Sequence, residues 1–367
     1  MNFDLTEEQT LLRNLIEKYV SDRYDPVKRL NYVRQQNGFD PEGWQLLAEM
    51  GVLAFPFAEA LGGFGGGQVE LITVAEALGR GVTTEPVLPV VLLAGCLLEK
   101  AGTVSQKEQW LEKIISGKGF VALAHSEKQA RFNPDLVETQ CVTKSGRTIL
   151  NGKKQLVLGG PFADAFIVSA MDKNSDLGLY LVPANADGLV RRNYRLTDGS
   201  LASDLELIDV TSEPMAGGIR ELKETISGAK LFICAELIGL MELMFEATLD
   251  YVKTRQQFGQ PIGRFQVIQH RMADNYKRLE LSRSQLYRVV TKDMENSSWQ
   301  VALTGTKSFI SENAVKLGEE AIQLHGGIGT TEELMVGQAF KKTLLFASLF
   351  GDSDFELHRY IQLAATV

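Results

Sequence analysis

The spacing of apolar residues predicts helices toward both ends of the chain and strands between them. Near the N-terminus, apolar residues recur at helical spacing from Leu11 to Val20, and Thr6 is placed to cap that helix. The helical pattern extends to about Ser116. It is interrupted by the Gly-rich stretch 61–67, after which a second helical run covers 69–79.

From about Gly119 to Arg220 the pattern changes to short runs rich in Val, Ile, Leu and Thr. Turn signals such as Asn151-Gly152 and Asp187-Gly188 separate these runs. The runs 166–169 and 179–182 are predicted to be strands of an antiparallel sheet or barrel.

Helical spacing returns after Gly228, where an apolar stripe runs from Leu237 to Val252. A second helix is predicted after a turn at 255–266, a third from about Trp299 to Leu324, and a fourth from about 333 to 350. Several long helices favour an antiparallel bundle that buries further surface by oligomerising. The predicted domains are a helical one at 1–117, a β domain at 118–217 and a helical one at 218–367.

Composition narrows the function. A net charge of -8 provides no basic field for nucleic-acid binding. Three widely spaced cysteines fit a reducing compartment, and the chain has neither a secretory signal pattern nor an apolar run of about 18 residues. We therefore expect a cytoplasmic enzyme without a membrane span. The four histidines lack metal-ligand spacing, so no metal site is expected.

Two segments predict a nucleotide-type cofactor. In the turn at 255–266, Arg255 offers a fork of N–H donors suited to a pyrophosphate, Phe258 offers an aromatic face, and Gln266 offers an amide. A simple helical corner with a solvated Arg is the structural alternative. The second segment, QLHGGIGT at 323–330, ends a helix with glycines and leaves backbone N–H groups accessible to a ligand.

With the order helical part, β part, helical part, the segments RQQFGQPIGRFQ and QLHGGIG resemble the acyl-CoA dehydrogenase family of flavoproteins. EALGGFG at 59–65 and LNGKK at 150–154 support the resemblance, which covers essentially the whole chain. It implies an α+β multidomain fold with an N-terminal α-helical domain, a central antiparallel β-barrel domain and a C-terminal four-helix bundle. It also implies a tetramer with FAD at a subunit interface, a CoA thioester substrate oxidised at its Cα–Cβ bond, and an electron-transfer flavoprotein as the oxidant.

The resemblance also assigns cofactor residues. In the family, one subunit lends the residues at these positions to FAD that its neighbour mainly holds. Arg255 would neutralise the pyrophosphate, and Phe258 would pack near the adenosine half. The positions carried over are Arg255, Phe258, Gln266, Gln323, Gly326 and Gly327.

The part of the family site that holds the flavin ring is altered here. The family segment Thr-Glu-x-x-x-Gly-Ser-Asp corresponds to 125–132, where only Ser126-Glu127 matches. The Trp-Ile-Thr strand beside the ring is replaced by Leu156-Val157-Leu158. This half of the site is therefore predicted to be incomplete.

The base position is altered as well. Counting back from Arg359 places Asp352 where the family has its catalytic Glu, and a one-residue gap would place Gly351 there instead. Capping of the last helix is the structural alternative for Asp352. The other Glu position used in the family falls at Ala229-Lys230, where this chain has no carboxylate.

These departures resemble the smaller subunits of heteromeric acyl-CoA dehydrogenases that act on bulky or dicarboxylic acyl chains, such as steroid side-chain or pimeloyl thioesters. We therefore expect an α2β2 assembly with a companion acyl-CoA dehydrogenase subunit, and a homotetramer is the alternative. Two other functions stay open. One is a nitroalkane-oxidase-like flavoenzyme with an Asp base, and the other is a catalytically silent subunit that completes its partner's FAD site.

Overall fold

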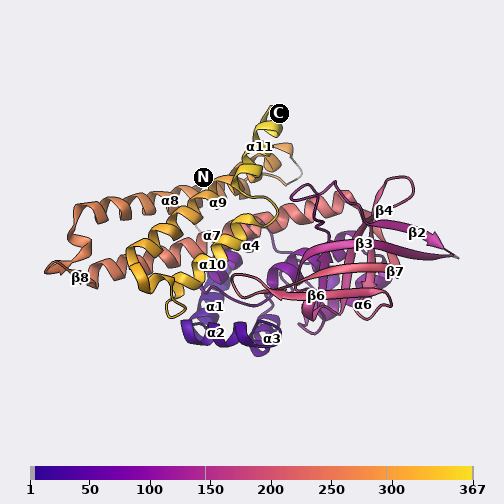
Figure 1. Ribbon diagram of the computed structural model, residues 1–367, viewed down its shortest axis with the longest axis horizontal. Helices are drawn as coiled ribbons and strands as arrows, with labels where there is room; N and C mark the ends of the chain where they lie inside the picture. Colours follow the sequence, from indigo (N-terminus) through magenta and orange to yellow (C-terminus); the bar gives the residue numbers. More distant parts are fainter. Residues whose placement is uncertain (1–4, 145, 295, 366–367) are drawn as a thin grey trace. The chain divides into compact units, whose positions relative to one another are not determined.

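The computed structural model describes residues 5–144, 146–294 and 296–365 (Figure 1). Backbone contacts divide the chain into two compact units. The helical unit comprises the described residues of 1–31, 68–83 and 230–367, and the β-containing unit comprises 32–67 and 84–229. Among the described residues, none of the helices is long and apolar enough to cross a membrane.

Seven strands of the β-containing unit form one sheet that closes into a ring. They are β1 (Val121–Ala124), β2 (Gln140–Lys144), β3 (Arg147–Leu158), β4 (Ala165–Met171), β5 (Leu177–Pro183), β6 (Leu189–Arg195) and β7 (Leu201–Gly218). Around the ring, β4 pairs with β2, then β2 with β3, β3 with β7, β7 with β5, and β5 again with β4. This confirms the predicted β domain. The pairings are antiparallel except those of β4 with β1 and β2, which are parallel.

The two predicted strands lie in β4 and β5, where they supply much of the barrel core. Phe166, Val168 and Val182 are fully buried there, together with Leu150 of β3. The same unit contains the short helical segments α3 (Pro41–Glu49), η1 (Glu59–Leu61), η2 (Val87–Gly95), α5 (Cys96–Ala101), α6 (Val104–Ile115) and η3 (Gly160–Phe162).

Long helices make up the helical unit, and α9 contacts α8, α10 and α11. The helices are α1 (Glu7–Arg23), α2 (Pro26–Arg34), α4 (Gln68–Arg80), α7 (Ile219–Thr254), α8 (Gln266–Val290), α9 (Ser297–His325), α10 (Met335–Ser348) and α11 (Ser353–Ala364); α2 ends and α7 begins in the other unit. Thr6 caps α1 as predicted, because its hydroxyl accepts from the Gln9 backbone N–H while the Gln9 side chain accepts from the Thr6 N–H.

Two glycines let α4 and α7 cross at close range. A Cβ added to Gly79 would lie 2.3 Å from the Glu236 carbonyl oxygen, and one added to Gly239 would lie 2.1 Å from the Glu76 carbonyl oxygen. Any side chain at either position would push the helices apart. This crossing brings the charged side chains of α4 close to those of α7.

Two predicted helix ends differ from the structure. The helix predicted to start after Gly228 begins at Ile219, since a single interior glycine costs only about 1 kcal/mol and buried Leu222 and Ile226 pack that first part. The helix predicted to reach residue 350 ends at Ser348. Leu349 is extended and Phe350 has a φ of 58°, which no helix allows.

Candidate functional site

The predicted cofactor turn folds as a tight hairpin. After α7, the short strands β8 (Gln256–Gln257) and β9 (Gln260–Pro261) pair around Phe258 and Gly259, and the 3-10 turn η4 (Ile262–Arg264) leads into α8. Phe258 has a φ of 52° and Gly259 a φ of 78°. Two left-handed residues in succession are what the tightest hairpin turns require, and Phe is an unusual residue for such a position.

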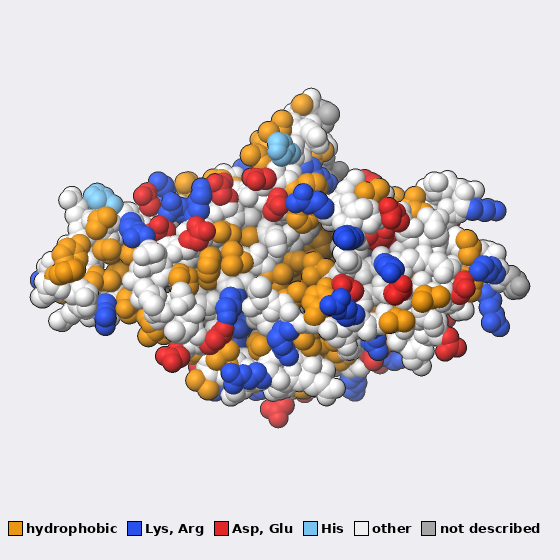
Figure 2. All heavy atoms as spheres, viewed as in Figure 1, with side chains coloured by type: hydrophobic (Ala, Val, Ile, Leu, Met, Phe, Trp, Pro, Cys, Tyr) orange, Lys and Arg blue, Asp and Glu red, His pale blue; other side chains and the backbone are white. Residues whose placement is uncertain are grey.

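The hairpin presents its Phe and its Arg to solvent. The Phe258 side chain is 91% exposed and meets Phe265 edge to face, with ring centroids 6.1 Å apart. Arg255 is exposed, and its guanidinium has neither a hydrogen bond nor an ion pair with any described residue. Figure 2 shows hydrophobic side chains at the surface of this end of the bundle, where Figure 1 labels β8. A ring and a cation held outside the core are available to a ligand or a partner.

The second predicted segment lies at the C-terminal end of α9. Gln323 is exposed, and Gly326 and Gly327 begin the 3-10 segment η5 (Gly326–Thr330). A Cβ added at Gly326 or Gly327 would meet nothing within 4 Å. Internal packing therefore does not require glycine at these two positions, although the φ of 68° at Gly326 favours it. The open space leaves room for a ligand to approach the backbone.

The structure brings the six predicted cofactor residues to one end of the helical unit. Tyr251, four residues before Arg255, stacks on His325 with centroids 4.4 Å apart, and its hydroxyl donates to the His325 carbonyl at 3.3 Å. Beneath this contact, Val252, Met272 and Leu324 form a small buried cluster. Gln266 starts α8 directly after the hairpin. These contacts join the end of α7, the start of α8 and the end of α9.

Asp352 lies elsewhere along the bundle. The Ser308 hydroxyl donates to the Ser353 carbonyl at 2.8 Å, so the start of α11 lies beside Ser308 of α9. Gln323 is fifteen residues further along α9, about 22 Å at the helical rise. Asp352 also borders a pocket of about 360 Å³ formed with α9 and α10. This chain therefore does not bring Asp352 together with its own six cofactor residues.

The Asp352 side chain caps α11. Its Oδ1 accepts from the backbone N–H of Phe355 at 2.8 Å, the structural alternative raised from the sequence. Upstream, the buried ammonium of Lys307 donates to the carbonyls of Phe346 and Ala347 at 3.1 and 3.0 Å. These bonds fix the end of α10 and hence the start of the loop that carries Asp352.

A buried ion pair that sequence reasoning missed lies directly under this loop. The ammonium of Lys230 on α7 bonds Oε1 of Glu356 on α11, and neither side chain is more than 4% exposed. Gly351, with a φ of 136°, passes so close that a Cβ there would lie 2.3 Å from Glu356 Oε1. The partners are 126 residues apart, so no local pattern links them. Because of this pair, position 351 has no room for a side chain.

In the β-containing unit, Glu127 of the matching Ser126-Glu127 pair is a buried structural carboxylate. Its Oε1 accepts from Lys154 Nζ at 2.6 Å and from the hydroxyl and backbone N–H of Thr139 at 2.7 and 3.1 Å. Its Oε2 accepts from the Glu138 backbone and the Gln129 amide, both at 2.7 Å. The protein itself therefore satisfies both carboxylate oxygens of Glu127.

The pKa values of this cluster reflect its burial. Burial would raise the pKa of Glu127, but the Lys154 charge and hydrogen bonds from Lys154, Thr139 and Glu138 lower it to about 2. Burial, followed by the charge of Lys154, lowers the pKa of His125 to about 4. At neutral pH the cluster therefore holds an ionised Glu127 and a neutral His125, whose Nδ1 lies 2.9 Å from the Ser169 hydroxyl.

The replaced strand also departs from regular geometry. Leu156 has a φ of 53° and lies at a register shift between β3 and β7. Its side chain is 37% exposed, and its backbone N–H donates to Asp204 at 3.2 Å. No cluster of three or more potential metal ligands occurs in the described parts of the chain.

Comparison with known proteins places all three parts of the chain in one family. The N-terminal, middle and C-terminal domain models of acyl-CoA dehydrogenases match residues 6–118, 122–210 and 216–362. "Probable acyl-CoA dehydrogenase YngJ" of Bacillus subtilis is 27% identical over 98% of each chain. Mitochondrial isovaleryl-CoA dehydrogenase of Pongo abelii is 28% identical over 95% of this chain and 87% of its own.

Among solved structures, the ChsE4-ChsE5 complex from Mycobacterium tuberculosis matches with a TM-score of 0.92 and 25% identity over all of both chains. A variant of the Tcur3481-Tcur3483 steroid acyl-CoA dehydrogenase matches with a TM-score of 0.90 and 27% identity over 98% of each chain. With all three domain models matched in order, this chain belongs to the acyl-CoA dehydrogenase family, FAD-dependent oxidoreductases that act on the CH–CH bond of CoA thioesters.

Proposed function

We propose that this chain works beside a companion acyl-CoA dehydrogenase subunit in an α2β2 assembly and lends its hairpin to the companion's FAD. The strongest support is that the six predicted cofactor residues and Asp352 lie far apart within one chain. Arg255 and Phe258 are held out to solvent, whereas Asp352 lies beside Ser308, about 22 Å from Gln323 along α9. Two solved relatives, ChsE4-ChsE5 and Tcur3481-Tcur3483, are each named as a pair of proteins.

The residues fit the dinucleotide half of FAD better than the ring half. A guanidinium without a partner among the described residues, an exposed ring and open space above Gly326 and Gly327 suit a pyrophosphate and an adenosine. In the β-containing unit, by contrast, Glu127 has no free oxygen to offer a ligand. FAD, when bound, supplies the hydride acceptor. This chain would contribute Arg255, Phe258, Gln266, Gln323 and the 326–327 backbone to holding it.

The proposed base is Asp352, which would take the α-proton of the acyl-CoA. Counting along the sequence places it where the family has its Glu, and the alternative position 351 is a glycine, which has no carboxylate. The acyl chain is proposed to be bulky or dicarboxylic, and an electron-transfer flavoprotein to be the oxidant. The boundaries at 117 and 217 and a cytoplasmic location belong to the same proposal.

Replacing Arg255 by Gln tests whether the hairpin contacts the FAD of the companion subunit. In the co-purified complex we expect Arg255→Gln to weaken FAD binding at least about tenfold, since a hydrogen bond to a charged group contributes about 1.5–3 kcal/mol. Flavin released on dilution, followed by fluorescence, measures the effect. Arg264→Gln, in the same exposed turn, is the matched control and should change FAD affinity less than about twofold. A protein that purifies alone as a homotetramer with one FAD per chain and full activity would contradict the α2β2 proposal.

Replacing Asp352 by Asn separates a catalytic from a silent subunit. Asn caps helices as well as Asp does, so stability should stay within about 0.5 kcal/mol. Loss of a general base should lower turnover about 100-fold or more. Asp354→Asn, on the first turn of the same helix, is the control and should leave turnover unchanged. Equal turnover of the Asp352 variant and the wild type would favour the catalytically silent subunit. In that case the role of Asp352 would be structural, as the cap of α11.

A further inference from the structure

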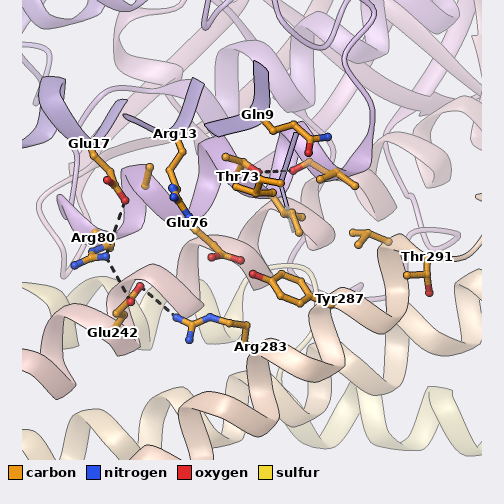
Figure 3. Close-up of a pocket in the computed structure, with 15 residues that line it drawn as sticks. Gln9, Arg13, Glu17, Thr73, Glu76, Arg80, Glu242, Arg283, Tyr287 and Thr291 are labelled. Carbon is orange, nitrogen blue, oxygen red and sulfur yellow. Dashed lines mark hydrogen bonds and ion pairs between the residues drawn. The ribbon is translucent and has the colours of Figure 1, made fainter. Parts of the chain in front are cut away.

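The helical unit contains a cavity that is lined by neither the six predicted cofactor residues nor Asp352. It encloses about 440 Å³ between α1, α4, α7 and α8, close to the α4–α7 crossing (Figure 3). This volume lies within the range of small-molecule sites in proteins. Three arginines and three glutamates line the cavity, and Leu5, Val69, Ile72 and Val290 give it an apolar wall.

Most of these charges neutralise one another. Arg80 pairs with Glu17 at 4.0 Å, with Glu242 at 3.4 Å and with Glu246 at 3.0 Å. Arg283 pairs with the other oxygen of Glu242 at 3.3 Å. These pairs hold α1, α4, α7 and α8 together around the cavity, and they leave Arg80, Arg283 and Glu242 with little charge to offer a ligand.

Two charged groups, Glu76 and Arg13, form no ion pair with any described residue, although each feels the charge of the other. No donor in the described part of the chain reaches Oε1 of Glu76, although that oxygen is buried. Arg13 forms neither a hydrogen bond nor an ion pair with any residue that the structure describes. In Figure 3 the carboxylate of Glu76 points into the space between Arg13, Arg283 and Tyr287. A buried carboxylate oxygen without a donor costs about 1–3 kcal/mol or more, which a ligand with an N–H donor would recover.

We propose that this cavity binds a small zwitterion of the amino-acid type, with its ammonium group on Glu76, its carboxylate on Arg13 and its aliphatic carbons against the apolar wall. A cation alone would leave Arg13 unmatched, and an anion alone would leave Glu76 unmatched. Water could satisfy one oxygen, but it gains nothing from the four apolar side chains. The site is separate from the six cofactor residues and from Asp352, so it does not depend on the proposed function.

Ligand binding should depend on pH. Burial raises the pKa of Glu76 to about 7, with Glu242 acting in the same direction and Arg283, Arg13 and Arg80 opposing it. Tyr287 also faces this carboxyl group, and burial raises its pKa to about 12, so it stays neutral. Glu76 therefore ionises as the pH rises through 7, and affinity for an ammonium group should increase between pH 6 and pH 8.

Calorimetric titration of the full-length protein tests the site. The probes are β-alanine and 5-aminopentanoate, with pentylammonium and pentanoate as single-charge controls. We expect at least one ω-amino acid to bind at least about tenfold more tightly than either control, and more tightly at pH 8 than at pH 6. Glu76→Gln should abolish binding and its pH dependence, and Arg13→Gln should remove the advantage over pentylammonium.

Glu17→Gln is the matched control, because Glu17 lines the same cavity but already pairs with Arg80. It should change affinity less than about threefold. Circular dichroism and melting curves confirm that each variant is folded, and Glu76→Asp replaces Glu76→Gln if the latter is not. The proposal is overturned if no probe binds at about 20 mM, a concentration at which even a binding free energy of about −2.3 kcal/mol would half-fill the site. It is equally overturned if the Glu76 variant binds as the wild type does.

Discussion

Lys154→Met is expected to lower the free energy of unfolding of the β-containing unit by about 3–5 kcal/mol. Lys154 is fully buried, and its ammonium bonds Glu127 at 2.6 Å and the Ser169 hydroxyl at 3.0 Å. Met fills a similar volume but removes the charge, which leaves the carboxylate of Glu127 ionised in the barrel wall with four neutral donors. Urea unfolding followed by circular dichroism measures the loss.

The neighbouring residue supplies the control. Lys153 pairs with Glu206 at 2.8 Å, but its side chain is 73% exposed, so Lys153→Met should cost less than about 1 kcal/mol. If the two variants lose the same stability, the buried pair does not stabilise the barrel. The double variant Lys154→Met with Glu127→Gln should recover part of the loss, because no charge then remains buried.

Acid unfolding provides a second check on the same pair. The folded-state pKa of Glu127 lies at about 2, below its ordinary value of 4.5. Its contribution to stability is therefore fully present above about pH 4.5 and is lost as the pH falls toward 2. Glu127→Gln should remove this part of the pH dependence. His125, whose pKa is lowered to about 4, adds a loss between about pH 6.5 and 4 that Glu127→Gln should leave in place.

Lys230→Met is the second variant expected to have a large effect, and it should release α11. Glu356 is fully buried, Lys230 is the donor to its Oε1, and its Oε2 already has no hydrogen-bond donor. Removing the ammonium leaves a buried carboxylate without its hydrogen-bonded cation, which should cost about 3–5 kcal/mol. Because Glu356 lies on the first turn of α11, the loss should appear there first.

Hydrogen exchange by mass spectrometry locates the effect. We expect amides of 353–364 to exchange faster in Lys230→Met, while the β-containing unit keeps its wild-type protection. Lys223→Met is the control on the same helix, since Lys223 and its partner Asp135 are both exposed. The double variant Lys230→Met with Glu356→Leu should restore protection of α11. Unchanged exchange in Lys230→Met would show that packing alone holds the helix.

Local patterns in the sequence were enough to predict most helices and strands and the turn at 255–266. Apolar spacing located α9, β4 and β5, and Thr6 caps α1 as its position predicts. The order of residues in the 255–266 turn supported the resemblance to the family without any tertiary information. Such features depend on neighbours within a few residues, which a single sequence displays.

Features that depend on distant partners could not be predicted in this way. Lys154 and Glu127 are 27 residues apart, and Lys230 and Glu356 are 126 apart, so neither pair has a sequence signature. Glu76 on α4 has the pattern of an ordinary helical Glu, and only the α4–α7 crossing makes it part of a cavity. The early end of α10 depends on the unusual φ of Phe350, which its residue type does not indicate.

The close approach of Gly351 to Glu356 also limits how this chain can evolve. A side chain at position 351 requires Glu356 to shift, because Glu356 Oε1 lies where its Cβ would be, and the φ of 136° strains any residue other than glycine. Shortening residue 356 first would strand the ammonium of Lys230 in the core, at a cost that most proteins cannot tolerate. A functional side chain at position 351 would therefore disturb the pair between Lys230 and Glu356. Position 352, whose side chain lies free of this pair, is open to selection in a single step.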